Sequence, residues 1–218
     1  MYNISAMNIF EELKAEAMET LDNGRGSHDW EHTERVLNMC LHIATAEGGD
    51  TNILTASALL HDIGRHTQDL NKGKVSHAVI SVDMARPILE KFKFNEEDIK
   101  KILHCIETHR YRKGGEPRSH EARILFDADK LDAIGAIGIG RAFVFAGENG
   151  AAVHIRNLDI ENSESYTKQD TAYREFKVKL EKIKDRIYTS EGKRIAAERH
   201  EFMVAFFERL KKESAGEI

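Results

Sequence analysis

Proline, cysteine and aromatic residues are all scarce in this chain of 218 residues. It has two prolines and two cysteines, and aromatic side chains make up 7% of it. The two cysteines, Cys40 and Cys105, lack the spacing of a metal-binding motif or a disulfide framework, so we expect buried, reduced thiols. With few prolines and many alanine, leucine, isoleucine, glutamate and lysine residues, the composition favours helix.

Long apolar runs and an excess of positive charge are also missing. No apolar run approaches the roughly 18 residues that a membrane-spanning helix needs. The first 21 residues mix charged and apolar side chains, unlike a secretory signal peptide. A net charge of −5 argues against a surface that binds DNA or RNA polymers, although a local basic patch remains compatible with it. We therefore expect a cytoplasmic protein that binds neither membranes nor nucleic-acid polymers, while its oligomeric state is not readable.

Helical periodicity runs through most of the chain, and no segment shows the alternation typical of strands. The spacing predicts an all-α fold, with residues 65–75 as a loop and residues 119–145 as one long helix. Helices are expected near residues 9–21, 29–47, 51–63, 76–92, 95–109, 119–145, 173–187 and 190–210. Since no linker is visible, we expect one domain over residues 1–218, in which a helical pair at about 169–212 packs on the rest.

Three glycines, Gly135, Gly138 and Gly140, lie within the predicted long helix. They do not form a dinucleotide-binding motif, because their order is reversed and no strand precedes them. Since each glycine inside a helix costs about 1 kcal/mol, close packing between helices is the expected reason for them.

Several histidines and aspartates occupy positions where burial or charge repulsion is unfavourable unless a metal ion or a hydrogen-bond partner is present. His61 and Asp62 directly follow the apolar run Ala58-Leu59-Leu60, and burying both groups is unfavourable without a partner such as a metal ion. Asp127, Asp129 and Asp132 are also close together, where like charges repel unless a cation or hydrogen-bond donors intervene. Any one of these residues would ordinarily be a surface side chain or a helix cap. Together they offer a mixed nitrogen and oxygen set that suits Mn, Fe, Ni, Co, Zn or Mg: His32, His61, Asp62 and Asp129.

Three ordered motifs resemble a known family. The segment His28-Asp29-Trp30-Glu31-His32-Thr33-Glu34-Arg35-Val36 is similar to the HDxxHxxRV motif of HD-domain metal-dependent phosphohydrolases. Leu59-Leu60-His61-Asp62-Ile63-Gly64 resembles their LLHDIG motif, and residues 127–138 resemble the DADxLDAIGAIG segment of the YedJ/YpgQ-like subgroup. The resemblance covers about residues 25–147, which form the motif-bearing core, and residues 148–218 carry no usable motif.

The resemblance implies an HD-domain helical bundle that holds a divalent metal ion between its helices. The family's ligands correspond to His32, His61, Asp62 and Asp129. Some members hold a second metal with two further histidines, for which His77 and His109 are the candidates. The alternative for these two is a supporting role or a contact with phosphate. Where other members place a catalytic glutamate after the HD pair, this chain has Arg65, His66 and Asp69, so the general acid or base stays open.

Catalysis and phosphate binding would involve further residues. Asp132, three residues after Asp129, could orient a metal-bound water, or could form a helix salt bridge instead. His109 is the second candidate catalytic residue. The segment from His109 to Arg118 forms a local positive cluster on an acidic chain, although an ordinary solvated loop is the alternative. The candidate phosphate-binding residues are Arg110, Arg112, Lys113 and Arg118.

These residues predict a metal-dependent phosphohydrolase that acts on a small phosphate compound, with a nucleotide as the expected substrate. The subgroup favours pyrophosphohydrolysis of a nucleoside triphosphate. Two alternatives stay open, namely a non-catalytic module that binds a metal or a nucleotide, and an HD-type diiron oxygenase.

Overall fold

The computed structural model describes residues 4–21, 30–70, 75–110 and 115–218, without the side chains of residues 4–8, 69 and 70. The described residues form helices joined by turns and loops and contain no strand, which confirms the all-α prediction. The elements in chain order are α1 (Ile4–Leu21), α2 (Trp30–Glu47), α3 (Thr51–Leu60), α4 (Arg65–Leu70), α5 (His77–Lys91), α6 (Glu96–Thr108), α7 (His120–Asp132), α8 (Gly135–Glu148), α9 (Ala172–Val178), the 3₁₀ helix η1 (Leu180–Arg186) and α10 (Ser190–Ala215).

The chain divides into two compact units, Met1–Asp129 and Lys130–Ile218. The boundary falls inside α7, so this helix is continuous with both units. Each unit has its own buried apolar core. The expectation that residues 1–218 form one domain stays a prediction.

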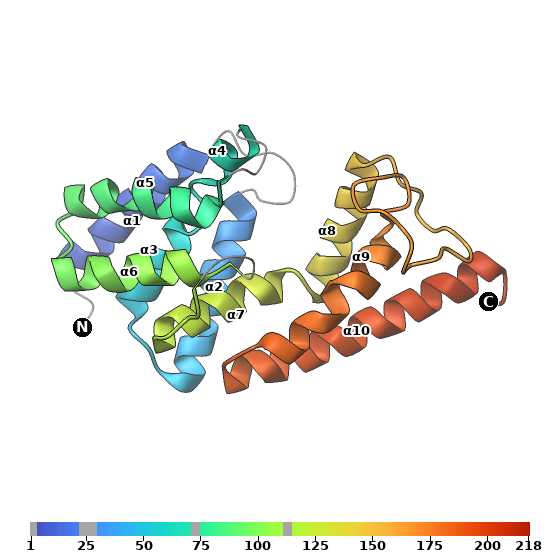
Figure 1. Cartoon of the computed structure of the whole chain (residues 1–218). Coiled ribbons are helices and arrows are strands. Elements are labelled where there is room, and N and C mark those ends of the chain that lie inside the picture. Colours follow the sequence, from blue (N-terminus) through green and yellow to red (C-terminus); the bar gives the residue numbers. More distant parts are fainter. Residues whose placement is uncertain (1–3, 22–29, 71–74, 111–114) are drawn as a thin grey trace. The chain divides into compact units, whose positions relative to one another are not determined.

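Helix α3 is the centre of the first unit. It packs against α1, α2 and α6, as Figure 1 shows, and most of its residues are buried. The helix is well defined at its start, because the Asp50 carboxylate accepts hydrogen bonds from the backbone N–H groups of Asn52 and Ile53. Because the second half of α3, from Ala56 to Leu60, is completely buried, the residues that directly follow it also lie in the interior of the unit.

The two cysteines belong to this core. Cys40 on α2 and Cys105 on α6 are buried free thiols, as expected. Burial raises the pKa of the Cys105 thiol to about 12, so it stays protonated at neutral pH and is a poor nucleophile.

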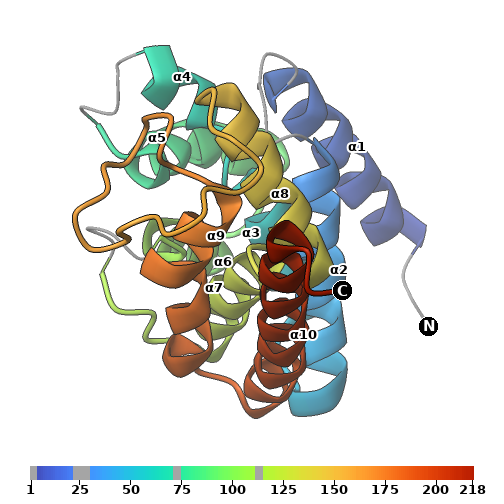
Figure 2. The same ribbon diagram turned by 90° about the vertical axis from the view of Figure 1, so that its right-hand side faces the viewer.

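The second unit is built around α10, which packs on α8 and η1, and Figure 2 shows this helix with its neighbours. An aromatic cluster supplies much of its core. The rings of Phe176 and Phe207 stack with their centroids 4.7 Å apart, and Tyr173 lies against Phe207 at 5.8 Å. Such aromatic pairs stabilise a core by about 0.5–1.5 kcal/mol beyond the area that they bury.

A buried ion pair holds the irregular segment that precedes α9. The Arg174 guanidinium donates to the Asp170 carboxylate at 2.7 Å, and both side chains are buried. Arg174 also donates to the hydroxyl and the carbonyl of Ser163. The other Asp170 oxygen accepts from the backbone N–H of Tyr166. Since both charges are paired and hydrogen-bonded, the pair attaches this segment to the core.

Three predicted segments differ from the structure. The expected helix over 173–187 is two elements, α9 and the 3₁₀ helix η1, because Lys179 between them leaves the α-helical conformation with a φ of −135°. The expected helix over 119–145 is interrupted, because Ile134 is extended and Gly135 has a positive φ of 77°. A side chain at Gly135 would also lie 2.9 Å from Arg199, so close helix packing and a left-handed backbone both call for glycine there. The expected loop over 65–75 contains the short helix α4.

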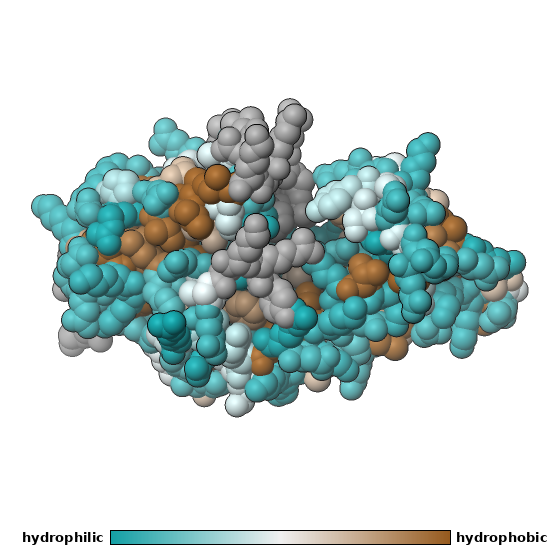
Figure 3. Space-filling model, viewed as in Figure 1, coloured by the Kyte–Doolittle hydropathy of each residue, from teal (hydrophilic) through white to brown (hydrophobic). Residues whose placement is uncertain are grey.

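Hydrophilic side chains cover most of the face that Figure 3 shows. Among the described residues, no helix has the length and hydrophobicity that crossing a membrane would require.

The glycines of α8 allow a matched test of packing. A Cβ at Gly138 would overlap the Ala133 carbonyl, whereas a Cβ at Gly140 would have no atom within 4 Å. We expect Gly140→Ala to raise the free energy of unfolding by up to about 1 kcal/mol, because alanine is the better helix former. Gly138→Ala should lower it, and urea unfolding followed by circular dichroism measures both. A Gly138→Ala variant as stable as Gly140→Ala would contradict the described junction of α7 and α8.

Candidate metal centre

His61 and Asp62 follow directly on the buried end of α3. Both are almost completely buried, at 0% and 2% exposure. The His61 Nδ1 atom donates to the Ala58 carbonyl at 2.7 Å, which satisfies one of the carbonyls left over at the end of a helix. Because Nδ1 then carries the proton, the lone pair of the ring lies on Nε2 and is available to a metal ion.

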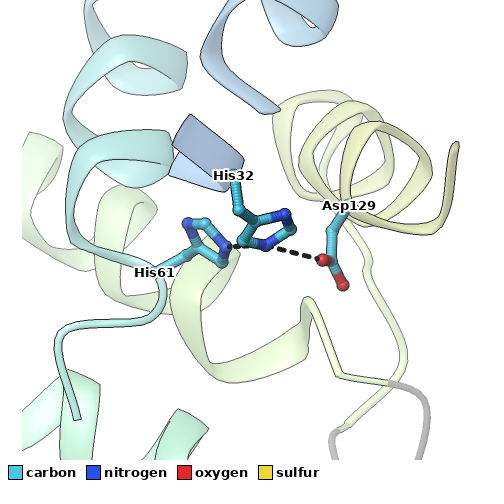
Figure 4. Close-up of side chains that lie close together, drawn as sticks. All are labelled: His32, His61 and Asp129. Carbon is cyan, nitrogen blue, oxygen red and sulfur yellow. Dashed lines mark hydrogen bonds and ion pairs between the residues drawn. The ribbon is translucent and has the colours of Figure 1, made fainter. Parts of the chain in front are cut away.

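A first group of ligand atoms forms around this nitrogen. His32 on α2 lies with its Nε2 3.4 Å from His61 Nε2, and 3.4 Å from Asp129 Oδ1 on α7. Figure 4 shows the three side chains pointing toward one another. Their ligand atoms lie within 4.8 Å of one another, so the group could hold a metal ion.

Asp62 faces this first group and a second one. Its Oδ2 atom is 3.9 Å from Nε2 of both His32 and His61. Its Oδ1 atom is 3.2 Å from His77 Nε2 and 3.6 Å from His109 Nε2. The Arg65 guanidinium, one helical turn further along the chain, donates to Oδ2 at 3.0 Å and fixes the orientation of the carboxylate. Asp62 can therefore contact cations on both of its sides.

The second group consists of Asp62, His77 and His109, all of them buried. His109, directly after α6, donates from Nδ1 to the Ile106 carbonyl at 2.6 Å. The Nδ1 atom of His77, the first residue of α5, lies 3.1 Å from the Gln68 side-chain oxygen and donates to it. Both rings therefore present Nε2 lone pairs, and these two atoms are only 3.1 Å apart. Two lone pairs at this distance repel unless a cation lies beside them, so the donor set fits a bound cation.

Burial favours the neutral form of His61 and His77. Loss of solvation lowers the pKa of His61 from its usual 6.5 to about 4, although Asp62 acts in the opposite direction. Loss of solvation also lowers the pKa of His77, again against the effect of Asp62. A neutral imidazole is the form that binds a metal ion, so both rings are ready as ligands at neutral pH.

The candidate catalytic residue Asp132 lies in the second unit, at the end of α7. It is buried, and its carboxylate accepts a hydrogen bond from Arg141 at 2.6 Å. Arg199 on α10 donates to the neighbouring Leu131 carbonyl at 2.6 Å. Asp132 therefore takes part in an ion pair, but with a residue of α8 and not within its own helix as the alternative interpretation expected, and its role toward a bound water stays a prediction.

The predicted phosphate-binding residues are only partly described. Arg110 is half-buried, and its Nη1 atom donates to Gln68 and to the Ser76 hydroxyl, each at 3.0 Å. Arg118 is exposed, and its backbone N–H donates to His104. Arg112 and Lys113 lie outside the described residues, as do His28 and Asp29 of the first motif.

Two residues support the site although neither was given this role from the sequence. Arg65 was named only as standing where other members place a catalytic glutamate, and its position three residues after Asp62 is the signal that could have paired the two. Gln68 gave no comparable signal, because its segment was interpreted as a loop. Its contact with His77 depends on the packing of α4 against α5.

Comparisons with known proteins show which proteins the chain is similar to. A family model described as the HD domain matches residues 29–134. The Bacillus subtilis (strain 168) protein YpgQ, described as uncharacterized, is 33% identical over 211 residues, which cover 94% of each chain. The crystal structure of Bacillus subtilis YpgQ in complex with ADP aligns with a TM-score of 0.74 and 29% identity, over 96% of this chain and 97% of that one. An HD-superfamily hydrolase from Bacillus thuringiensis aligns with a TM-score of 0.77 and 30% identity, over 96% and 98%.

The buried neutral histidines predict how the stability of the metal-free protein depends on pH. Above pH 6.5, His61 is neutral in both the folded and the unfolded protein, and its protonation does not lower the free energy of unfolding. As the pH falls from 6.5 toward 4, the unfolded chain binds a proton that the folded protein does not. The free energy of unfolding should therefore fall, by up to about 1.4 kcal/mol per pH unit for each such histidine.

Urea unfolding of the metal-free protein between pH 7 and 5 measures this slope. The exposed His42, on the same helix as His32, provides the control, and His42→Ala should leave the slope unchanged. A metal-free parent whose stability is flat over this range would contradict the neutral, buried state of His61.

Proposed function

The chain belongs to the HD domain family, and on this basis we propose that it is a metal-dependent phosphohydrolase acting on a small phosphate compound, most favourably a nucleotide. The favoured reaction is pyrophosphohydrolysis of a nucleoside triphosphate. The observation that carries the proposal is the convergence of buried imidazole nitrogens and carboxylates from α2, α5, α7 and the ends of α3 and α6. The ADP complex of the similar protein YpgQ supports the choice of a nucleotide.

In this proposal His32, His61, Asp62 and Asp129 hold a divalent metal ion, whose identity among Mn, Fe, Ni, Co, Zn and Mg is open. A bound divalent ion lowers the pKa of its water and polarises a phosphoryl oxygen. The contribution of the chain is to present neutral rings and oriented carboxylates. The Ala58 carbonyl holds the His61 ring, and Arg65 holds the Asp62 carboxylate.

The remaining roles concern the reacting groups and the phosphates. We assign His109 to the second cation or to the substrate phosphate, and Asp132 to orienting the reacting water. Arg110, Arg112, Lys113 and Arg118 are proposed to bind the phosphates of the substrate, because arginine forks and lysine ammonium groups match phosphate oxygens. On a chain with a net charge of −5, this local positive cluster would attract an anionic substrate.

One observation favours a second candidate function. The two ligand groups share Asp62, with one of its oxygens toward each, and a diiron oxygenase would also need two neighbouring cation sites. An iron content near two per chain together with an oxygen-dependent product would support the oxygenase. A protein that binds metal and nucleotide without turnover would instead be a non-catalytic module.

A phosphate-release assay tests the proposed function. We expect the protein to hydrolyse at least one member of a panel of nucleoside mono-, di- and triphosphates, supplied in turn with Mn²⁺, Mg²⁺, Ni²⁺ and Co²⁺. His61→Ala and Asp62→Ala should each lose about 100-fold or more of this activity, because several kcal/mol of transition-state stabilisation depend on the bound ion.

Metal content by elemental analysis should fall in both variants, whereas His42→Ala, an exposed substitution, should match the parent. Full metal content in His61→Ala and Asp62→Ala would contradict the assigned ligands. Absence of turnover across the whole panel would contradict the phosphohydrolase.

The role of the second group is tested by removing one of its rings. His109→Ala should keep one tightly bound metal ion at His32, His61, Asp62 and Asp129, because His109 is not one of the ligands proposed for it. Activity should nevertheless fall, through loss of the second cation or of a phosphate contact. Metal titration together with steady-state kinetics measures both effects, and activity within about twofold of the parent would make His109 a structural residue.

A further inference from the structure

The Gln68 side chain lies beside the second ligand group but contributes no atom to it. We propose that Gln68 is a positioning residue that fixes the His77 ring with Nε2 facing Asp62 and His109. This inference rests on the proposed cation at Asp62, His77 and His109. It assigns a role to a residue that the three family motifs do not contain.

A single oxygen carries the argument. The Gln68 Oε1 atom lies 2.8 Å from the backbone nitrogen of His77 and 3.1 Å from the Nδ1 atom of its ring. The Arg110 Nη1 atom reaches the same oxygen at 3.0 Å. Three donors therefore meet one amide oxygen, which orders the side chain of a residue that is itself only half-buried.

This contact decides which nitrogen of His77 carries the proton. A side-chain amide oxygen can only accept a hydrogen bond, so a ring nitrogen 3.1 Å away has to donate. Nδ1 is therefore protonated, and the lone pair of the neutral ring is on Nε2. That atom lies 3.2 Å from Asp62 Oδ1 and 3.1 Å from His109 Nε2, which is where a shared cation would be held.

The same oxygen also supports the start of α5. The first N–H groups of a helix have no partner within it, and the side chain of the N-cap residue often accepts from one of them. Here Ser76 occupies the N-cap position without making such a bond, and its hydroxyl is instead within 3.0 Å of Arg110 Nη1. Gln68 supplies the missing acceptor from α4 and thereby orders the backbone and the ring of His77 together.

Titration with Mn²⁺ alone tests the inference, with the free ion quantified by electron paramagnetic resonance. We expect the parent to bind two Mn²⁺ ions per chain. Gln68→Leu should keep the first ion and bind the second about 10- to 100-fold more weakly, as is typical when a group that supports a metal ligand is lost. Gln68→Glu, which keeps an acceptor oxygen at the same reach, should restore the second site.

Gln169 provides the matched control, because it is the other glutamine of the chain and is exposed in the second unit. Gln169→Leu should bind both ions like the parent. A Gln68→Leu variant that binds both ions within twofold of the parent would overturn the inference while leaving the proposed function intact. A parent that binds a single ion would instead overturn the second cation of the proposed function.

A measurement without metal separates positioning from a general effect on folding. In ring-nitrogen NMR spectra of the metal-free parent, His77 should appear as the Nδ1–H tautomer, since the shifts of the two nitrogens distinguish the tautomers. Gln68→Leu should shift His77 toward a mixture of tautomers, while His61 and His109 keep theirs through the Ala58 and Ile106 carbonyls. An Nε2–H tautomer in the parent, or an unchanged Nδ1–H tautomer in Gln68→Leu, would overturn the proposal even if the variant were less stable.

Discussion

His61 and Asp62 follow an apolar helix inside the first unit, where water cannot solvate either group. At 0% and 2% exposure, an isolated imidazole and an isolated carboxylate would lose solvation free energy without compensation. Here hydrogen bonds and ion pairs with neighbouring groups compensate for that loss. The Ala58 carbonyl accepts the Nδ1 proton of His61, Arg65 pairs with one Asp62 oxygen, and histidines from two further positions face the other. The helices that pack around α3 bring these partners of His61 and Asp62 together.

Hydrogen bonds to the far side of each ring prepare the centre for cations. The Nδ1 atoms of His61, His77 and His109 each contact an oxygen, so each Nε2 atom presents a lone pair. The low pKa of His61, about 4, follows from the same burial and leaves the ring neutral. This arrangement is unfavourable when nothing is bound, because the Nε2 atoms of His77 and His109 lie 3.1 Å apart, and it becomes favourable around a cation.

The second unit stabilises the end of the helix that carries Asp129. Arg141 pairs with Asp132, Arg199 donates to the Leu131 carbonyl, and the positive φ of Gly135 turns the chain into α8. Carbonyls at the end of a helix have no partner within it, so a guanidinium is a suitable one. Through Arg199, the region 148–218 without a recognisable motif thus has a structural part at the end of α7.

The sequence by itself determined the all-α class, most helix boundaries and the identity of the candidate ligands. These follow from local signals such as apolar spacing and from three ordered motifs. Tertiary structure alone decided that Asp62 faces two groups, that Gln68 holds His77, that Asp132 pairs with Arg141, and that α7 ends before Gly135. The physical reason is that the three contacts each join side chains from different segments, and the turn at Gly135 fits the side chain of Arg199 on α10. The spacing of residues along one helix carries no information about which residues of other helices lie beside it.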